Sequence, residues 1–156
     1  MGWGQEDLAD WNWLYKQINE VRLMFNLDYK CMEWAQNIIN FVDKNDNKKV
    51  KELENNLRKA LGVLQGDGVY AMFLWLEDKD KEKNIRKNLI NLLDETEIRK
   101  HLLTDSDKFE EDFSKFCVKL REVAEDIDKL LFMKKILERT LIYGLYHAKI
   151  GGSKNE

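Results

Sequence analysis

The chain has 156 residues, of which 35% are charged and 44% apolar, and its formal net charge is −3 at pH 7. This length fits one domain with an ordinary buried core, and the composition is that of a globular protein rather than a disordered chain or a membrane protein. Proline is absent and only eight residues are glycine. Because so few helix breakers remain, the sequence favours an all-α fold.

Apolar residues at helical spacing predict four helices in the first half of the chain. The first covers about residues 5–25, and the second begins after Asp28, which is a suitable N-cap residue. A third helix runs from about Asn47 to the Gly-Asp-Gly sequence at 66–68. The fourth follows at once over about 69–76, and it is so densely apolar that we expect it to be buried on nearly all sides.

The Gly-Asp-Gly sequence at 66–68 raises the question of a phosphate-binding loop. A Walker loop needs Lys-Ser or Lys-Thr after its last glycine, whereas Val69 follows here, and a dinucleotide loop needs a preceding strand, whereas a helix is predicted. A structural interpretation fits better. Gly66 or Gly68 is expected to end the third helix as its C-cap, and Asp67 to cap the fourth.

The second half of the chain predicts two short helices and a long C-terminal one. The short helices lie near 85–93 and 98–103, and the acid-rich segment 104–112 is typical of a helix start. From there apolar residues step by four and three as far as Leu130. The stripe then shifts, so the long helix either turns against its neighbours near 128–134 or divides there. The whole pattern predicts a single-domain antiparallel bundle of about six to seven helices.

No catalytic or metal-binding motif stands out in the sequence. His101 and His147 are expected to be surface histidines, and Cys31 and Cys117 to be small buried apolar residues without metal-ligand spacing. The carboxylates at 110–112 are explained as acids that the helix dipole favours in a first turn. We therefore expect no enzyme activity, no cofactor and no metal.

Location follows from two further features. The longest uncharged run, 61–76, contains the Gly-Asp-Gly sequence and cannot span a bilayer. The amino end is acidic and has no apolar segment typical of a signal peptide. The sequence therefore predicts a cytoplasmic protein that does not contact membranes.

Two sets of side chains remain as candidate binding surfaces. Paired bases late in two helices could bind phosphates together, although each alone also complements a helix dipole. Tryptophans near the amino end form a candidate protein interface. The bases are Arg58, Lys59, Lys134, Lys135 and Arg139, and the tryptophans are Trp3, Trp11 and Trp13.

Three blocks of the sequence carry a family resemblance. They are YKCMEWAQNIINFV at 29–42, LRKALGVLQGDGVYAMFLWLEDK at 57–79 and FSKFCVKLREVAEDIDKLLFMKKILERTL at 113–141. In these blocks the chain resembles the small all-helical subunit, the fifth Cmr protein, of the type III-B (Cmr) CRISPR effector complex. The likeness covers about 29–146, so residues 29–149 are interpreted as a Cmr small-subunit-like domain. Residues 1–28 would then be a helical extension and 150–156 a disordered tail.

The resemblance implies a non-catalytic structural subunit in antiviral defence. Such a subunit stacks on copies of itself and on other Cmr subunits along the guide RNA–target RNA, and it contacts RNA through basic residues. The alternative is a helical adaptor that binds only protein, through the surface of Trp3, Trp11 and Trp13. The candidate RNA-binding residues that the resemblance implies are Lys30, Arg58, Lys59, Lys79, Lys134, Lys135 and Arg139.

Overall fold

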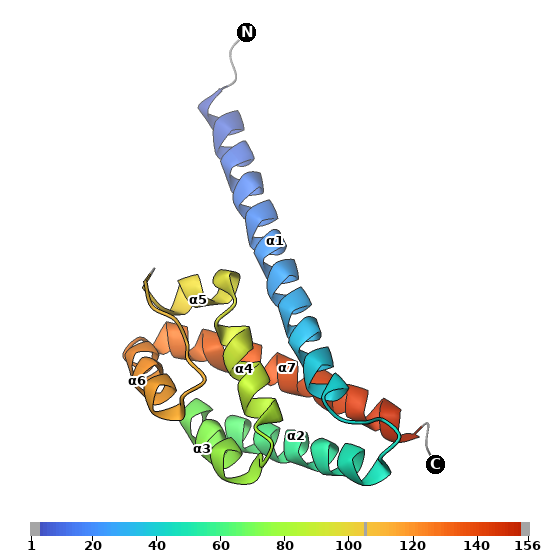
Figure 1. Cartoon of the computed structure of the whole chain (residues 1–156). Helices are drawn as coiled ribbons and strands as arrows, with labels where there is room; N and C mark the ends of the chain where they lie inside the picture. Colours follow the sequence, from blue (N-terminus) through green and yellow to red (C-terminus); the bar gives the residue numbers. More distant parts are fainter. Residues whose placement is uncertain (1–3, 105, 154–156) are drawn as a thin grey trace.

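The computed structural model describes residues 4–104 and 106–153, which form seven α-helices and no strand (Figure 1). The predicted all-α bundle with a long C-terminal helix is confirmed. The helices, in chain order, are α1 (Gln5–Asn40), α2 (Asn47–Asp67), α3 (Val69–Lys79), α4 (Asn84–Leu93), α5 (Thr96–Leu102), α6 (Phe113–Ala124) and α7 (Ile127–Ser153).

Helix α7 is the centre of the bundle, because both α1 and α2 pack along it. Helices α2 and α7 meet at Leu57 and Gly144, where a Cβ on the glycine would lie 3.5 Å from each Leu57 Cδ atom, an ordinary contact. At the far end of the bundle, Phe73 of α3 packs against Phe116 of α6, with their ring centroids 4.6 Å apart. These buried side chains belong to one continuous core.

Helix α1 is a single helix of 36 residues, so the predicted boundary at Asp28 is wrong. The predicted extension and the main domain therefore share one helix. The Asp28 carboxylate accepts hydrogen bonds from the Tyr143 hydroxyl at 2.5 Å and from Arg139 Nη1 at 3.3 Å, both on α7. An aspartate that suits an N-cap in sequence thus holds two helices together.

Only the C-terminal half of α1 packs on the bundle. Cys31, Ala35 and Ile38 are buried there, whereas every described side chain from Leu8 to Asp10 and most from Trp11 to Asn26 are exposed. Figure 1 shows this amino-terminal half of α1 standing clear of the other helices. The projecting half of α1 is defined here as residues 8–26.

Gly68 ends α2 as predicted. Its φ is +102°, a value that side chains rarely allow, and its N–H donates to the carbonyls of Val63 and Leu64. Asp67 is the last residue of α2, so the prediction that it caps the next helix is wrong. No side chain caps α3.

Helix α3 is not buried on all sides. Val69, Met72, Phe73 and Leu76 are buried, while Tyr70 and Leu74 are exposed. These exposed residues lie on the face of α3 that its main neighbours, α2, α4 and α7, leave uncovered. The expectation of burial all round is therefore corrected to burial of one face.

The long C-terminal segment is divided, and earlier than residues 128–134. Helix α6 ends at Ala124, and α7 begins at Ile127 after a turn in which Asp126 accepts a hydrogen bond from the Asp128 N–H. Ile127 is 70% exposed, so the apolar seam of α6 ends at Val123. Residues 150–153, assigned to a tail from sequence, are helical in α7, and 154–156 lie outside the described residues.

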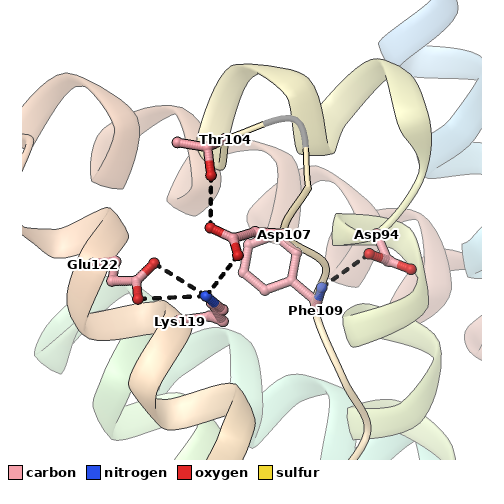
Figure 2. Close-up of polar contacts among 6 residues, drawn as sticks. All are labelled: Asp94, Thr104, Asp107, Phe109, Lys119 and Glu122. Carbon is pink, nitrogen blue, oxygen red and sulfur yellow. Dashed lines mark hydrogen bonds and ion pairs between the residues drawn. The ribbon is translucent and has the colours of Figure 1, made fainter.

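Within the acid-rich segment, residues 106–112 form a loop rather than a helix start (Figure 2). The Thr104 hydroxyl donates to Asp107 at 2.7 Å, and the Lys119 ammonium lies 3.0 Å from Asp107 and 3.4 Å from Glu122. The hydrogen bond from Thr104, aided by Lys119, lowers the pKa of Asp107. Asp107 thus binds side chains in this loop, and α6 starts later, where Asp112 is the N-cap and accepts from the Lys115 N–H.

The same loop places an aromatic ring in the core. The Phe109 N–H donates to the Asp94 carboxylate at 2.9 Å (Figure 2). Arg99 Nη1 donates to the same carboxylate oxygen at 3.2 Å. Phe109 is 4% exposed, and its ring centroid lies 5.9 Å from that of Phe116. Phe109 therefore begins the buried seam without being helical.

Candidate nucleic-acid interface and protein-docking surface

The seven candidate RNA-binding residues are spread over four helices, α1, α2, α3 and α7. Four of them contact carboxylates, which neutralises part of their charge toward a phosphate. The other three, Lys59, Lys134 and Lys135, form no ion pair with a described residue. The ion pairs are Lys30 with Glu33 and Glu95, Arg58 with Glu54, Lys79 with Asp78, and Arg139 with Asp28.

Lys30 joins α1 to the turn between α4 and α5. Its ammonium lies 3.4 Å from Glu95 and 3.3 Å from Glu33, while the Trp34 indole N–H donates to Glu95 at 2.9 Å. Partial burial acts to lower the pKa of Lys30, but the two carboxylates outweigh it and raise that pKa. Within this structure Lys30 has a structural role.

A groove of about 390 Å³ separates the projecting half of α1 from the first half of α7. It brings two candidate residues, Lys135 and Arg139, to one rim, beside the Phe132 ring. Bases next to an aromatic ring are the combination that single-stranded nucleic-acid binders use. The lining residues are Glu20, Leu23, Met24, Leu27 and Cys31 of α1, and Phe132, Lys135, Ile136 and Arg139 of α7.

The sequence interpretation missed the α1 wall of this groove. Leu23, Leu27 and Cys31 follow one another at steps of four, a signal that continues one helix across Asp28. The Cys31 thiol donates to the Ile136 carbonyl at 3.7 Å, and burial raises the pKa of this thiol. The cysteine is therefore part of the wall, as a buried apolar side chain.

Asp28 fixes the groove, and its replacement by asparagine tests this. The hydrogen bond to Asp28, together with burial, raises the pKa of Tyr143. This contribution to stability is complete below the ordinary tyrosine pKa and is lost as the pH rises through the raised value. We expect Asp28→Asn to return that pKa toward its usual range and to lower the free energy of unfolding by about 1–2 kcal/mol.

Absorbance titration of phenolate and urea unfolding measure these two effects of Asp28→Asn. Asp10→Asn removes the same charge from the exposed part of α1 and is the control. An unchanged Tyr143 titration in the Asp28 variant would show that the hydrogen bond does not form in solution.

The second candidate surface is on the projecting half of α1. Trp11 and Trp13 are 57% and 63% exposed, but two residues correspond to about 200° around a helix, so they do not form one patch. Trp3 lies outside the described residues. Trp11 instead shares a face with other exposed apolar side chains, namely Leu14, Ile18, Val21 and Phe25.

Among the described residues, no group of three or more histidine, cysteine or acidic side chains could hold a metal ion. No helix in that part of the chain is both long and apolar enough to cross a bilayer. His101 and His147 are exposed, and His101 packs its ring against Phe132 with centroids 5.7 Å apart.

Comparison of the chain with protein-family models, with curated proteins and with solved structures finds no match. Two surfaces of the molecule therefore remain as the basis for a function. One is the groove between α1 and α7, and the other is the exposed apolar face of α1.

Proposed function

We propose that this chain is a non-catalytic structural subunit of a type III-B (Cmr) RNA-silencing complex in the cytoplasm. In this role it stacks with copies of itself and with other Cmr subunits along the guide RNA–target RNA in antiviral defence. The resemblance of its three sequence blocks supports the assignment to this complex. The proposed RNA contact rests on the groove between α1 and α7, where Phe132, Lys135 and Arg139 of α7 line one wall.

The groove suits a single-stranded backbone for three reasons. Lys135 is exposed and has no carboxylate partner among the described residues, so its charge is available to a phosphate. Arg139 uses one guanidinium nitrogen on Asp28, which leaves further donors. Lys134 precedes Lys135 on α7, is half-buried, and is not among the residues that line the groove. The apolar wall and Phe132 offer a surface on which a base can stack.

Salt titration of binding to labelled single-stranded RNA tests this proposal. About four phosphate contacts give a slope near −2.8, so affinity falls roughly 50-fold between about 50 and 200 mM salt. Replacing two bases, Lys134→Glu with Lys135→Glu, is expected to reduce the slope by about 1.4 and to weaken binding. Circular dichroism should show unchanged helicity.

A second double variant with the same charge change distinguishes loss of a specific phosphate contact from a general change in the electrostatic field of the protein. Lys48→Glu with Lys51→Glu makes the same charge change on exposed residues of α2. This control should leave the salt slope near that of the native chain. Equal losses in the two double variants, or loss of helicity in the first, would contradict a binding site at Lys134 and Lys135.

The second candidate function is a helical adaptor that binds only protein. The observation that favours it is the exposed apolar face of the projecting half of α1, including Trp11. Monomeric proteins rarely expose contiguous apolar patches of this kind unless they bind a partner. A folded chain that fails to bind RNA even at about 50 mM salt, where phosphate contacts are strong, would favour the adaptor.

A further inference from the structure

The projecting half of α1 carries a narrow apolar band. Its five members are spaced by three, four, three and four residues, which is the heptad spacing of a coiled-coil seam. At about 100° per residue they fall within an arc of roughly 80°. All are exposed, from 41% for Leu14 to 71% for Phe25. The α1 band is Trp11, Leu14, Ile18, Val21 and Phe25.

The α1 band points away from the bundle that the same helix contacts. The side of α1 that packs on the bundle is marked by Leu27, Cys31 and Ile38. Helix geometry places the band roughly 140° around the axis from that side. Since α1 is continuous and Asp28 fixes it to α7, the bundle of the same chain does not cover the band. A partner that covers the α1 band must therefore be another molecule.

The exposed area is the amount that a stable dimer requires. Leu8, Tyr15 and Tyr29 are exposed along one edge of the α1 band and widen it. If these eight side chains each leave roughly 100 Å² of apolar surface to solvent, the total is about 800 Å² per chain. A standard protein interface buries about 800 Å² on each partner.

Charge favours a second copy of this chain as the occupant. No member of the α1 band is charged, and Lys16 and Glu20 lie on the opposite side of the helix. Two copies therefore meet without like charges in contact, and symmetry guarantees that their spacing matches. The absence of a base within the band also makes it a poor surface for RNA.

The edges of the α1 band indicate that the two helices run parallel. Asp10 flanks one edge and Arg22 the other, while Asp28, near the first edge, is already bound to Tyr143 and Arg139 of its own chain. In a parallel pair, a two-fold axis along the helices brings the acidic edge of one copy to the basic edge of its partner. An antiparallel pair would bring like edges together. The bundles, on a different side of each α1, do not obstruct the parallel pairing.

We propose that α1 is a dimerisation helix, in which two copies of this chain pair their α1 bands in a parallel two-stranded coiled coil. The proposed function has copies of the chain stack along RNA, and this proposal goes beyond it by assigning a surface that pairs two copies without RNA. Dimerisation through the projecting half of α1 leaves the groove between α1 and α7 of each copy open.

Light scattering across a concentration series of the full chain tests the dimer. The native chain should reach twice its monomer mass of 18.6 kDa. Ile18→Glu places a charge at the centre of the α1 band in both copies and should weaken dimerisation at least about tenfold, while Asn19→Glu, a quarter turn away, should not. A native chain that stays monomeric at its highest attainable concentration overturns the proposal, as does equal weakening by the two variants.

Oxidative cross-linking tests the direction of the pair. Val21→Cys should give a disulfide-linked dimer, because a parallel pair places Val21 opposite its own copy. A dimer by mass that does not cross-link at this position overturns the parallel arrangement. Titration of Ile18→Glu with an RNA too short to reach two grooves separates the two proposals, because loss of the dimer should then leave the salt slope of each chain unchanged.

Discussion

Replacing Phe73 by alanine is expected to lower the free energy of unfolding by about 3–5 kcal/mol. The Phe73 side chain is fully buried and packs against Phe116, so truncation leaves a cavity that neighbouring helices cannot fill. In a chain of this size each kcal/mol lowers the melting temperature by about 2–4 °C. Urea unfolding followed by circular dichroism measures the loss.

Tyr70→Ala is the control for Phe73→Ala. It removes an aromatic ring from the same helix, α3, at a position that is 55% exposed. Tyr70→Ala should change the free energy of unfolding by no more than about 0.5 kcal/mol, as for most surface substitutions. A similar loss in both variants would mean that α3 buries a different face in solution.

The second large effect is expected for Leu57→Ala, at about 2–5 kcal/mol. Leu57 is fully buried where α2 crosses Gly144 of α7. Gly144→Ala should be tolerated in the native chain, because its Cβ would lie 3.5 Å from each Leu57 Cδ atom, an ordinary contact. In the double variant the added methyl group fills part of the cavity left by Leu57.

A double-mutant cycle in urea measures the coupling between Leu57 and Gly144. We expect the double variant to be more stable than the sum of the single changes by about 0.5 kcal/mol or more, as for residues in contact. Strict additivity would show that α2 and α7 do not meet at these two residues.

Local patterns were sufficient to predict much of the bundle. The helices near Asn47, Ile85 and Ile98 could be predicted because their apolar spacing is regular and their boundaries are polar turns. Gly68 could be predicted as a helix end because a positive φ suits glycine and few other residues. These signals depend only on neighbouring residues.

The errors arose where a distant partner decides the local structure. Asp28 has the residue type of an N-cap, yet its partners are on α7, more than a hundred residues away in the chain. Asp107 suggested a first helical turn, yet Lys119 and Thr104 bind it in a loop. A carboxylate that binds a side chain and one that binds a helix end are the same in sequence.

Exposure was the property least accessible from the sequence. The periodicity of α1 correctly gives an apolar face, but it does not tell whether another element covers that face. A surface position could be expected for any of the candidate lysines. The groove at Lys135, however, forms only because α1 and α7 lie beside each other in the folded chain. The pairing of Lys30 with Glu95 likewise depends on tertiary structure.

The continuity of α1 has a mechanical consequence. The helix contains neither glycine nor proline, so it is a stiff rod between its outer end and the groove. From Trp11 to Cys31 it spans about 30 Å. Two copies joined along their α1 bands would hold their grooves at a fixed separation, and a strand that reaches both would gain avidity without any new contact. The distance between the two grooves would then set the shortest RNA that can bind both of them at once.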